Sequence, residues 1–187
     1  MQHIELKGQI RQAGNKACVK ALRRQGLVPC NLYGNGLENV LFTVNAQDLK
    51  AVTNTPASYI VDLTLDNGEK YEAILHEAQW HPVTDEALHV DFLAVSADKP
   101  VVIAVPVKIV GHSEGVKLGG KLMVSVRKLK ISALPANLPD DITVDVTSLQ
   151  IGKRIVAGDL EIENVNVVSP KATIICSVKA TRASKGE

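Results

Sequence analysis

Four basic residues recur at the spacing of one helix face. They stand at positions i, i+4, i+7 and i+8, which is an arc of about 100° on a helix, and they are Lys16, Lys20, Arg23 and Arg24. No carboxylate lies in this segment. Such a face suits phosphate groups, because each phosphate that a cation neutralises releases condensed counterions. A solvated helix face is the alternative interpretation, although solvated faces usually mix charges of both signs.

A second group of residues could form hydrogen bonds or take part in acid–base chemistry. It consists of His76, Gln79, His81, His89 and Asp91. His89 and Asp91 are two apart on a predicted strand and therefore share a face, where an aspartate can orient an imidazole. Contact with RNA and mutual structural pairing at a barrel mouth both remain open for this pair. A metal site or catalytic pair is disfavoured, because no helical His pair, cysteine ligand or nucleophile motif accompanies it. We therefore expect no enzyme, metal or cofactor.

Short elements must position these residues in the first half of the chain. An alternating pattern predicts a strand over 3–11, and a helix over 16–25 ends at Gly26 and is expected to bury Cys18, Ala21 and Leu22. Further strands are predicted over 31–33, 40–44, 59–65, 70–79 and 88–95, with a short helix that begins after Asn45. The turn 66–68, Asp-Asn-Gly, indicates a hairpin. Trp80 either stacks on a base or plugs the loop 80–86, and plugging is favoured.

The second half reads as a separate run of Val-rich and Ile-rich strands. A polar linker is predicted over 96–100, and strands follow over 101–110, 121–134, 142–146 and 165–180, the last broken at Pro170. Residues 151–160 are expected to be irregular or helical, and the tail 181–187 disordered. The fold class is therefore mainly β, with domains over 1–95 and 101–180.

Composition restricts the function classes. The chain has 187 residues, 45% apolar content, 3% aromatic content and a net charge of +1. Residues 1–95 have a net charge of −3 and residues 96–187 one of +4, so RNA binding by the first half requires a local basic patch. Few aromatic residues are available for base stacking, so charge and shape must carry an RNA contact. With three cysteines, no C-x-x-C pair and no apolar run of membrane length, we expect a cytoplasmic protein.

Two stretches resemble one known family. They are residues 10–34, which include Leu22-Arg23-Arg24-Gln25-Gly26-Leu27-Val28-Pro29, and residues 79–92, which include Gln79-Trp80-His81-Pro82 and Leu88-His89-Val90-Asp91-Phe92. The sequence is similar here to the bacterial large-subunit ribosomal protein twenty-five family, and the second β domain resembles its long form, the CTC general stress protein type. The resemblance implies an N-terminal six-stranded β-barrel with flanking short helices, followed by a second all-β domain.

The same resemblance implies binding to the loop E region of 5S ribosomal RNA. The family's contact positions, together with the basic face derived above, give the expected RNA-binding residues Arg11, Lys16, Lys20, Arg23, Arg24, Tyr33, His76, Gln79, His81, His89 and Asp91. Expected partners are 5S rRNA, the large ribosomal subunit and neighbouring ribosomal proteins, with no membrane. The protein is expected to be ribosome-associated, and monomeric off the ribosome. The alternative is a β-rich protein-interaction module that meets an acidic partner through its basic face.

Overall fold

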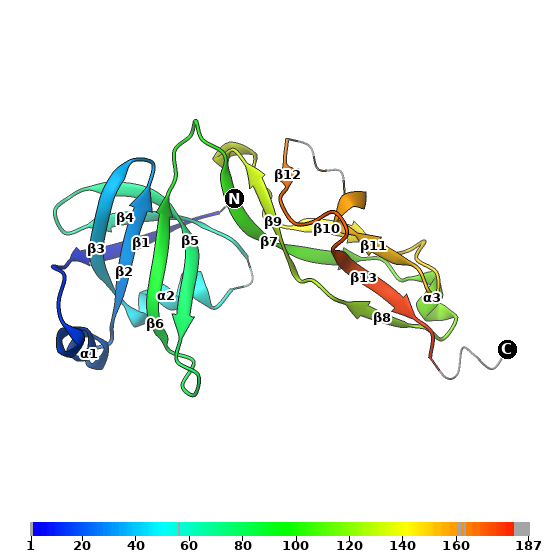
Figure 1. Ribbon diagram of the computed structural model, residues 1–187, viewed down its shortest axis with the longest axis horizontal. Helices are drawn as coiled ribbons and strands as arrows, with labels where there is room; N and C mark the ends of the chain where they lie inside the picture. Colours follow the sequence, from blue (N-terminus) through cyan, green and yellow to red (C-terminus); the bar gives the residue numbers. More distant parts are fainter. Residues whose placement is uncertain (1, 56, 161, 163, 182–187) are drawn as a thin grey trace. The chain divides into compact units, whose positions relative to one another are not determined.

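A computed structural model describes residues 2–55, 57–160, 162 and 164–181 of the chain. The chain forms two compact units, residues 1–99 and residues 100–187, shown in Figure 1. The expected mainly β fold is confirmed: the first unit contains a closed six-stranded barrel, and further β sheets follow in the second. The tail expected to be disordered lies outside the described residues except for Thr181, whose hydroxyl donates to the backbone oxygen of Gly119 at 2.6 Å.

Unit 1 consists of six strands and two short helices. The strands are β1 (His3–Ile10), β2 (Leu27–Gly34), β3 (Leu37–Asn45), β4 (Ile60–Leu65), β5 (Lys70–Trp80) and β6 (Ala87–Ala94). The helices are α1 (Lys16–Arg24) and α2 (Ala46–Thr53). The strands close in the order β1-β3-β2-β6-β5-β4, so that β6 lies between β2 and β5.

Alternation along the strands fills the barrel with apolar side chains. Inward-facing residues such as Leu6, Leu32 and Phe92 are almost fully buried, and Phe42 packs on Phe92 with ring centroids 5.8 Å apart. Helix α2 adds Leu49 and Val52 to this core. The interior is therefore a packed core, and polar residues of the strands are left on the outer surface.

Two local signals from the sequence are confirmed in unit 1. Asn45 caps α2 with its side-chain oxygen, which accepts from the backbone N–H of Gln47 at 3.0 Å. The β4–β5 hairpin turns through Asp66-Asn67-Gly68, where Gly68 has φ +87° and the Asn67 side chain accepts from the N–H of Glu69. Only a residue that tolerates positive φ fits this turn without strain.

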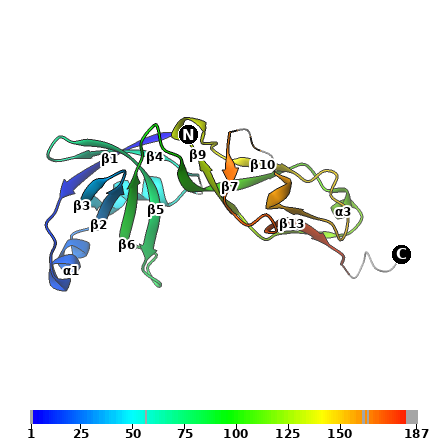
Figure 2. The same cartoon turned by 45° about the horizontal axis from the view of Figure 1, so that its top comes forward.

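Unit 2 contains two small sheets. Strands β10 (Ile142–Asp145), β7 (Val101–Val110), β9 (Lys128–Ala133) and β12 (Asn166–Val167) form a four-stranded sheet. Strands β11 (Arg154–Val156), β13 (Ile174–Lys179) and β8 (Lys121–Val124) form a three-stranded sheet. The short helical pieces are α3 (Glu114–Lys117), η1 (Pro135–Asn137) and η2 (Ala157–Asp159). Figure 2 shows β7 and β13 from a second angle.

Two predictions for this unit are wrong. The single strand expected over 121–134 is two strands, because the chain leaves β8 in one sheet at Val124 and enters β9 in the other at Lys128. The piece expected to be irregular or helical over 151–160 contains the strand β11 before the helical turn η2. Between β8 and β9 the chain changes sheet without a glycine or proline to mark the change, whereas Gly152 and Gly158 flank β11 and suggested an irregular segment there.

Candidate nucleic-acid interface

Helix α1 begins at a capped N-terminus and ends at a turn with a positive-φ glycine. The Asn15 side-chain oxygen accepts from the backbone N–H of Cys18 at 3.1 Å, which satisfies one of the free donors of the first turn. Gly26 follows the helix with φ +77°, and the chain then enters β2. The expected helix is thus confirmed to within one residue.

The expected buried stripe of α1 is wrong. Cys18 and Ala21 are exposed, and the helix has no fully buried residue. Of the three residues expected to be buried, only Leu22 is half-buried, and Val19 is the other half-buried residue of the helix. Projection at 100° per residue gives only the relative directions of the side chains and does not show which direction faces the barrel.

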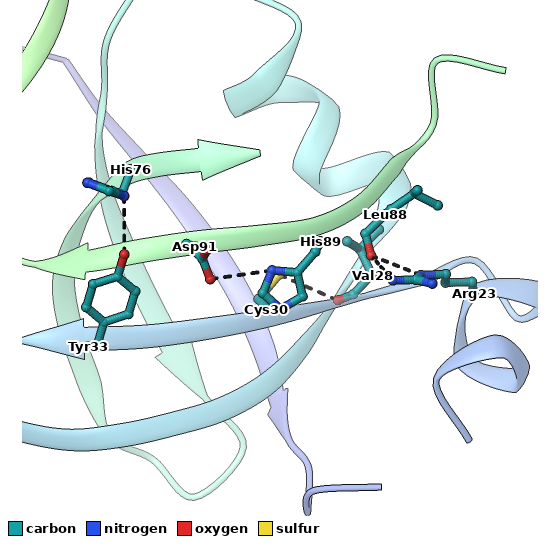
Figure 3. A network of polar contacts seen from close by, with 8 residues as sticks. All are labelled: Arg23, Val28, Cys30, Tyr33, His76, Leu88, His89 and Asp91. Atoms are coloured by element: carbon teal, nitrogen blue, oxygen red, sulfur yellow. Dashed lines mark hydrogen bonds and ion pairs between the residues drawn. The ribbon is translucent and has the colours of Figure 1, made fainter. Parts of the chain in front are cut away.

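A side-chain contact ties the end of α1 to the barrel wall. The Arg23 guanidinium donates two hydrogen bonds to the backbone oxygen of Leu88 in β6, from Nε at 2.9 Å and from Nη2 at 2.7 Å (Figure 3). Arg23 was expected to point its charge at a partner together with the other cations. Its charge is exposed, but two of its donors are already used.

The other three cations of α1 form what we call the basic helix face, Lys16, Lys20 and Arg24. All three are exposed. Within the described part of the chain none of them has a hydrogen-bond or ion-pair partner, because the ion pairs found there involve other residues. The basic helix face is therefore available to an external anion.

The polar residues of the second group lie on the outside of the β2–β6–β5 wall. Asn31 of β2 is in register with Asp91 of β6, which is in register with Glu77 of β5, and Gln79 is in register with His89. Because register partners share a face, these side chains point away from the core. A bulge in β5 between Leu75 and Glu77 adds His76. We call Tyr33, His76, Gln79, His89 and Asp91 the polar wall.

Two contacts order the polar wall, and Figure 3 shows both. His89 Nδ1 lies 3.4 Å from a carboxylate oxygen of Asp91, with both side chains about a fifth exposed (21% and 22%). The Tyr33 hydroxyl lies 3.2 Å from Nδ1 of His76, and the two rings meet edge to face. Burial raises the pKa of Tyr33, and the charges of Asp91 and Glu77 raise it further, so the phenol remains a neutral donor.

His81 has a local structural contact outside the wall. Its Nδ1 accepts from the backbone N–H of Val83 at 3.3 Å and of Thr84 at 3.2 Å, at the start of the loop between β5 and β6. Trp80, for which plugging of the loop was favoured, is instead 42% exposed. It lines a hollow of about 400 Å³ between α1, α2 and this loop, whose other lining residues include Arg23, Leu27, Lys50 and Glu86.

Arg11 lies just beyond β1, where its backbone N–H donates to the oxygen of Leu41 at 2.9 Å. Leu41 is in register with Asn31, which connects this position to the polar wall across β3 and β2. Arg11 is half-buried, and its Nε is enclosed. The structure therefore brings most of the predicted residues onto one side of unit 1, with His81 in the loop beyond it.

Comparison with known proteins gives two matched families and a set of full-length relatives. Residues 6–92 match the Ribosomal L25p family, and residues 100–182 match the C-terminal domain of ribosomal protein TL5. A "Large ribosomal subunit protein bL25" of Porphyromonas gingivalis is 42% identical over 186 residues, covering 100% of this chain and 97% of the relative. Proteins of the same name from Bacteroides thetaiotaomicron (44% over 191 residues) and Phocaeicola vulgatus (43% over 192 residues) cover 100% of this chain and 96% of the relative.

The chain belongs to the bL25 family. The resemblance seen in the sequence is thereby confirmed over both units. As a member of a ribosomal protein family, it is a structural protein and not an enzyme. Among the described residues, no helix is long and apolar enough to cross a membrane, and no cluster of three His, Cys, Asp or Glu side chains is arranged to hold a metal ion.

Sequence reasoning missed two parts of this bL25 surface. Asn31 lies beside Asp91 on the wall, and its polar type within a strand was the available signal. The backbone oxygen of Leu88, which receives Arg23, carries no signal in the sequence because every residue has such an oxygen. The contact becomes visible only when the fold brings together residues that are 65 positions apart.

Proposed function

We propose that unit 1 binds the 5S RNA of the large ribosomal subunit at its loop E region. The bL25 relatives are named as proteins of that subunit, which makes this chain a large-subunit ribosomal protein associated with the ribosome in the cytoplasm. The finer assignment to 5S RNA draws on the family resemblance of the first unit. It is supported by two adjoining surfaces of that unit, the basic helix face and the polar wall.

The observation that carries the proposal is that the basic helix face has no ion-pair or hydrogen-bond partner among the residues that the structure describes. Lys16, Lys20 and Arg24 project from a helix that is capped at Asn15 and held to β6 by Arg23. Cations held in place by the fold lose less conformational freedom when they meet phosphates. The rest of the unit is acidic, so attraction to RNA is local to this face and does not extend over the whole barrel.

The polar wall provides the second part of the proposed contact. An irregular RNA helix exposes base edges and ribose hydroxyls in a wide, shallow minor groove, and a strand wall can lie across such a groove. Gln79 offers donors, and the carboxylate of Asp91 offers an acceptor for a ribose hydroxyl or a base amine. The His89–Asp91 and Tyr33–His76 contacts fix the directions of these groups before RNA arrives.

A gel shift of the full-length chain with 5S RNA tests the proposal. Lys16→Glu combined with Lys20→Glu reverses two charges of the basic helix face, and we expect loss of the shift with an unchanged melting temperature. A matched control is Lys7→Glu combined with Lys70→Glu. Both lysines are exposed and in register with Thr64 of β4, away from the polar wall. The control should bind like the wild type.

Three other outcomes would contradict the proposal. A gel shift of the Lys16/Lys20 variant equal to that of the wild type would show that the basic helix face does not contact the RNA. Equal loss in both double variants indicates a general charge effect. No shift of the wild-type chain at low salt favours the alternative, in which the basic helix face meets an acidic protein.

A further inference from the structure

Three cations share the solvent-facing side of the three-stranded sheet in unit 2. We call Lys121 of β8, Lys179 of β13 and Arg154 of β11 the basic sheet face. All three side chains are exposed. They come from three separate strands, so no pattern within a single element of the sequence reveals them as a group.

The strand register places these side chains next to one another. Lys121 is directly opposite Lys179 in the β8–β13 ladder, and Arg154 is opposite Ser177 in the β13–β11 ladder. Ser177 is two residues before Lys179 and therefore on the same side of β13. Directly opposite side chains have Cβ atoms about 5 Å apart and diagonal ones about 7–8 Å, so the three cations form one compact group.

The opposite side of the same sheet is buried, which fixes the direction of the basic sheet face. Cys176 and Val178 of β13 pack with Val146 and Leu149 in one apolar cluster, and Leu122 and Ile155 pack against it. A register shift by one residue would bury the cations and expose this cluster. The outward direction of Lys121, Lys179 and Arg154 is thus enforced by the core.

The basic sheet face has no internal counter-charge in the described part of unit 2. None of its three cations forms a described ion pair, whereas Lys108 on the other sheet pairs with Asp141 at 3.2 Å. The side chains between them, Met123 and Ser177, are uncharged. Like charges directly opposite one another destabilise a sheet, so the Lys121–Lys179 pair is unfavourable in the free protein.

We propose that the basic sheet face binds the ribose-phosphate backbone of a structured RNA, as a contact of unit 2 separate from the 5S RNA contact of unit 1. A polyanion relieves the Lys121–Lys179 repulsion and satisfies all three cations. A protein partner fits less well, because the centres of protein interfaces are depleted of charged residues and rich in apolar ones. Among the described strands of this sheet, only Met123 and Val124 are exposed large apolar side chains. The chain belongs to a ribosomal protein family, so its surroundings are rich in RNA.

The test uses the full-length chain and protein-free RNA from bacterial large subunits from which 5S RNA has been removed. Lys121→Gln combined with Lys179→Gln removes two charges with little change in shape. We expect the log–log slope of affinity against salt to become shallower by about 1.5, since each phosphate contact contributes roughly 0.7–0.9. The melting temperature should stay the same or rise, because the repulsion is gone.

A matched control is Lys128→Gln combined with Lys130→Gln. These exposed lysines are on β9, in register with Pro106 and Ala104, and their sheet also presents the Lys108–Asp141 pair and Asp145. The control removes the same charge from the same unit on a face of mixed sign. We expect its salt slope to remain within experimental error of the wild-type slope.

Each remaining outcome overturns the proposal. An unchanged salt slope in the Lys121/Lys179 variant would show that RNA does not bind this face. An equal change of slope in the control would show that the effect comes from the overall charge of unit 2. Unchanged RNA binding with weaker co-sedimentation with large subunits assigns the face to a protein neighbour. The 5S gel shift of the Lys121/Lys179 variant should match the wild type, so failure of the unit 1 proposal and failure of this one are read from different variants.

Discussion

Arg23 of α1 donates two hydrogen bonds to the backbone oxygen of Leu88 in β6, at 2.9 Å and 2.7 Å. This contact connects the only predicted RNA-binding helix to the strand that carries His89 and Asp91. A helix of nine residues with no buried side chain has little packing to hold it. The Arg23–Leu88 contact is therefore what orients the basic helix face relative to the polar wall.

Replacing Arg23 with alanine should loosen α1. Loss of two charge-assisted hydrogen bonds at an exposed site should lower the free energy of unfolding by about 1 kcal/mol. Binding to 5S RNA should weaken as well, because the remaining cations are no longer held in place. Arg24→Ala is the control, since it removes the same charge from an unpaired side chain. Urea unfolding should show Arg23→Ala less stable than Arg24→Ala, and equal stability would contradict this role.

Asn15 should contribute through the cap it provides for α1. Asn15→Ala removes the acceptor for the N–H of Cys18 and should destabilise the helix by about 1 kcal/mol. The charge of the protein is unchanged, so any loss of 5S RNA affinity reports fraying of the helix. Asn15→Ser retains a capping oxygen and should bind RNA like the wild type. Amide hydrogen exchange across 16–20 measures the fraying directly, and unchanged exchange in Asn15→Ala would refute the prediction.

The three cysteines should differ in reactivity. Cys18 is exposed, whereas Cys30 and Cys176 are buried, and burial raises the pKa of both buried thiols, that of Cys30 to about 12. The thiolate is the reactive form, so DTNB at pH 8 should modify one thiol in the folded protein and three in guanidinium chloride. Rapid modification of Cys30 in the folded protein would be inconsistent with the closed barrel.

The raised pKa of Cys30 also predicts how stability changes at alkaline pH. Above the ordinary thiol pKa of 9.0, the unfolded chain releases a proton that the folded chain keeps until about pH 12. The folded state binds more protons in this window, so the free energy of unfolding falls as pH rises, by up to about 1.4 kcal/mol per pH unit. Cys30→Ala should flatten this fall between pH 9 and 11, while Cys18→Ala should not. Equal pH dependence in both variants would contradict the assignment to Cys30.

Local signals in the sequence were enough to predict much of the secondary structure of unit 1. Asn45 predicts the start of α2, Gly68 marks the hairpin, and alternation along β6 indicates which residues face the core. The first half of β2 could not be predicted, because Pro29 lies in it and a proline argues against a strand interior. It stands one residue before the pairing with β6 begins at Cys30, and so at a position where the strand is still an edge on that side.

Contacts between distant residues could not be predicted in the same way. The spacing of Lys16, Lys20 and Arg24 identifies a shared face, but only the fold shows that Arg23 turns to Leu88 and that Cys18 lies in solvent. The basic sheet face of unit 2 was even less predictable, because Lys121 and Lys179 become neighbours through a strand register that neither strand specifies alone. Periodicity reports on one element at a time, whereas a surface combines several.

The salt dependence of 5S RNA binding tests the central claim most directly. For the full-length wild type we predict a log–log slope of roughly −3 to −5, as expected for four to six phosphate contacts. Lys16→Gln combined with Lys20→Gln should make the slope shallower by about 1.5, while Lys7→Gln combined with Lys70→Gln should leave it unchanged. A slope in the Lys16/Lys20 variant equal to that of the wild type would show that the basic helix face does not contact phosphate.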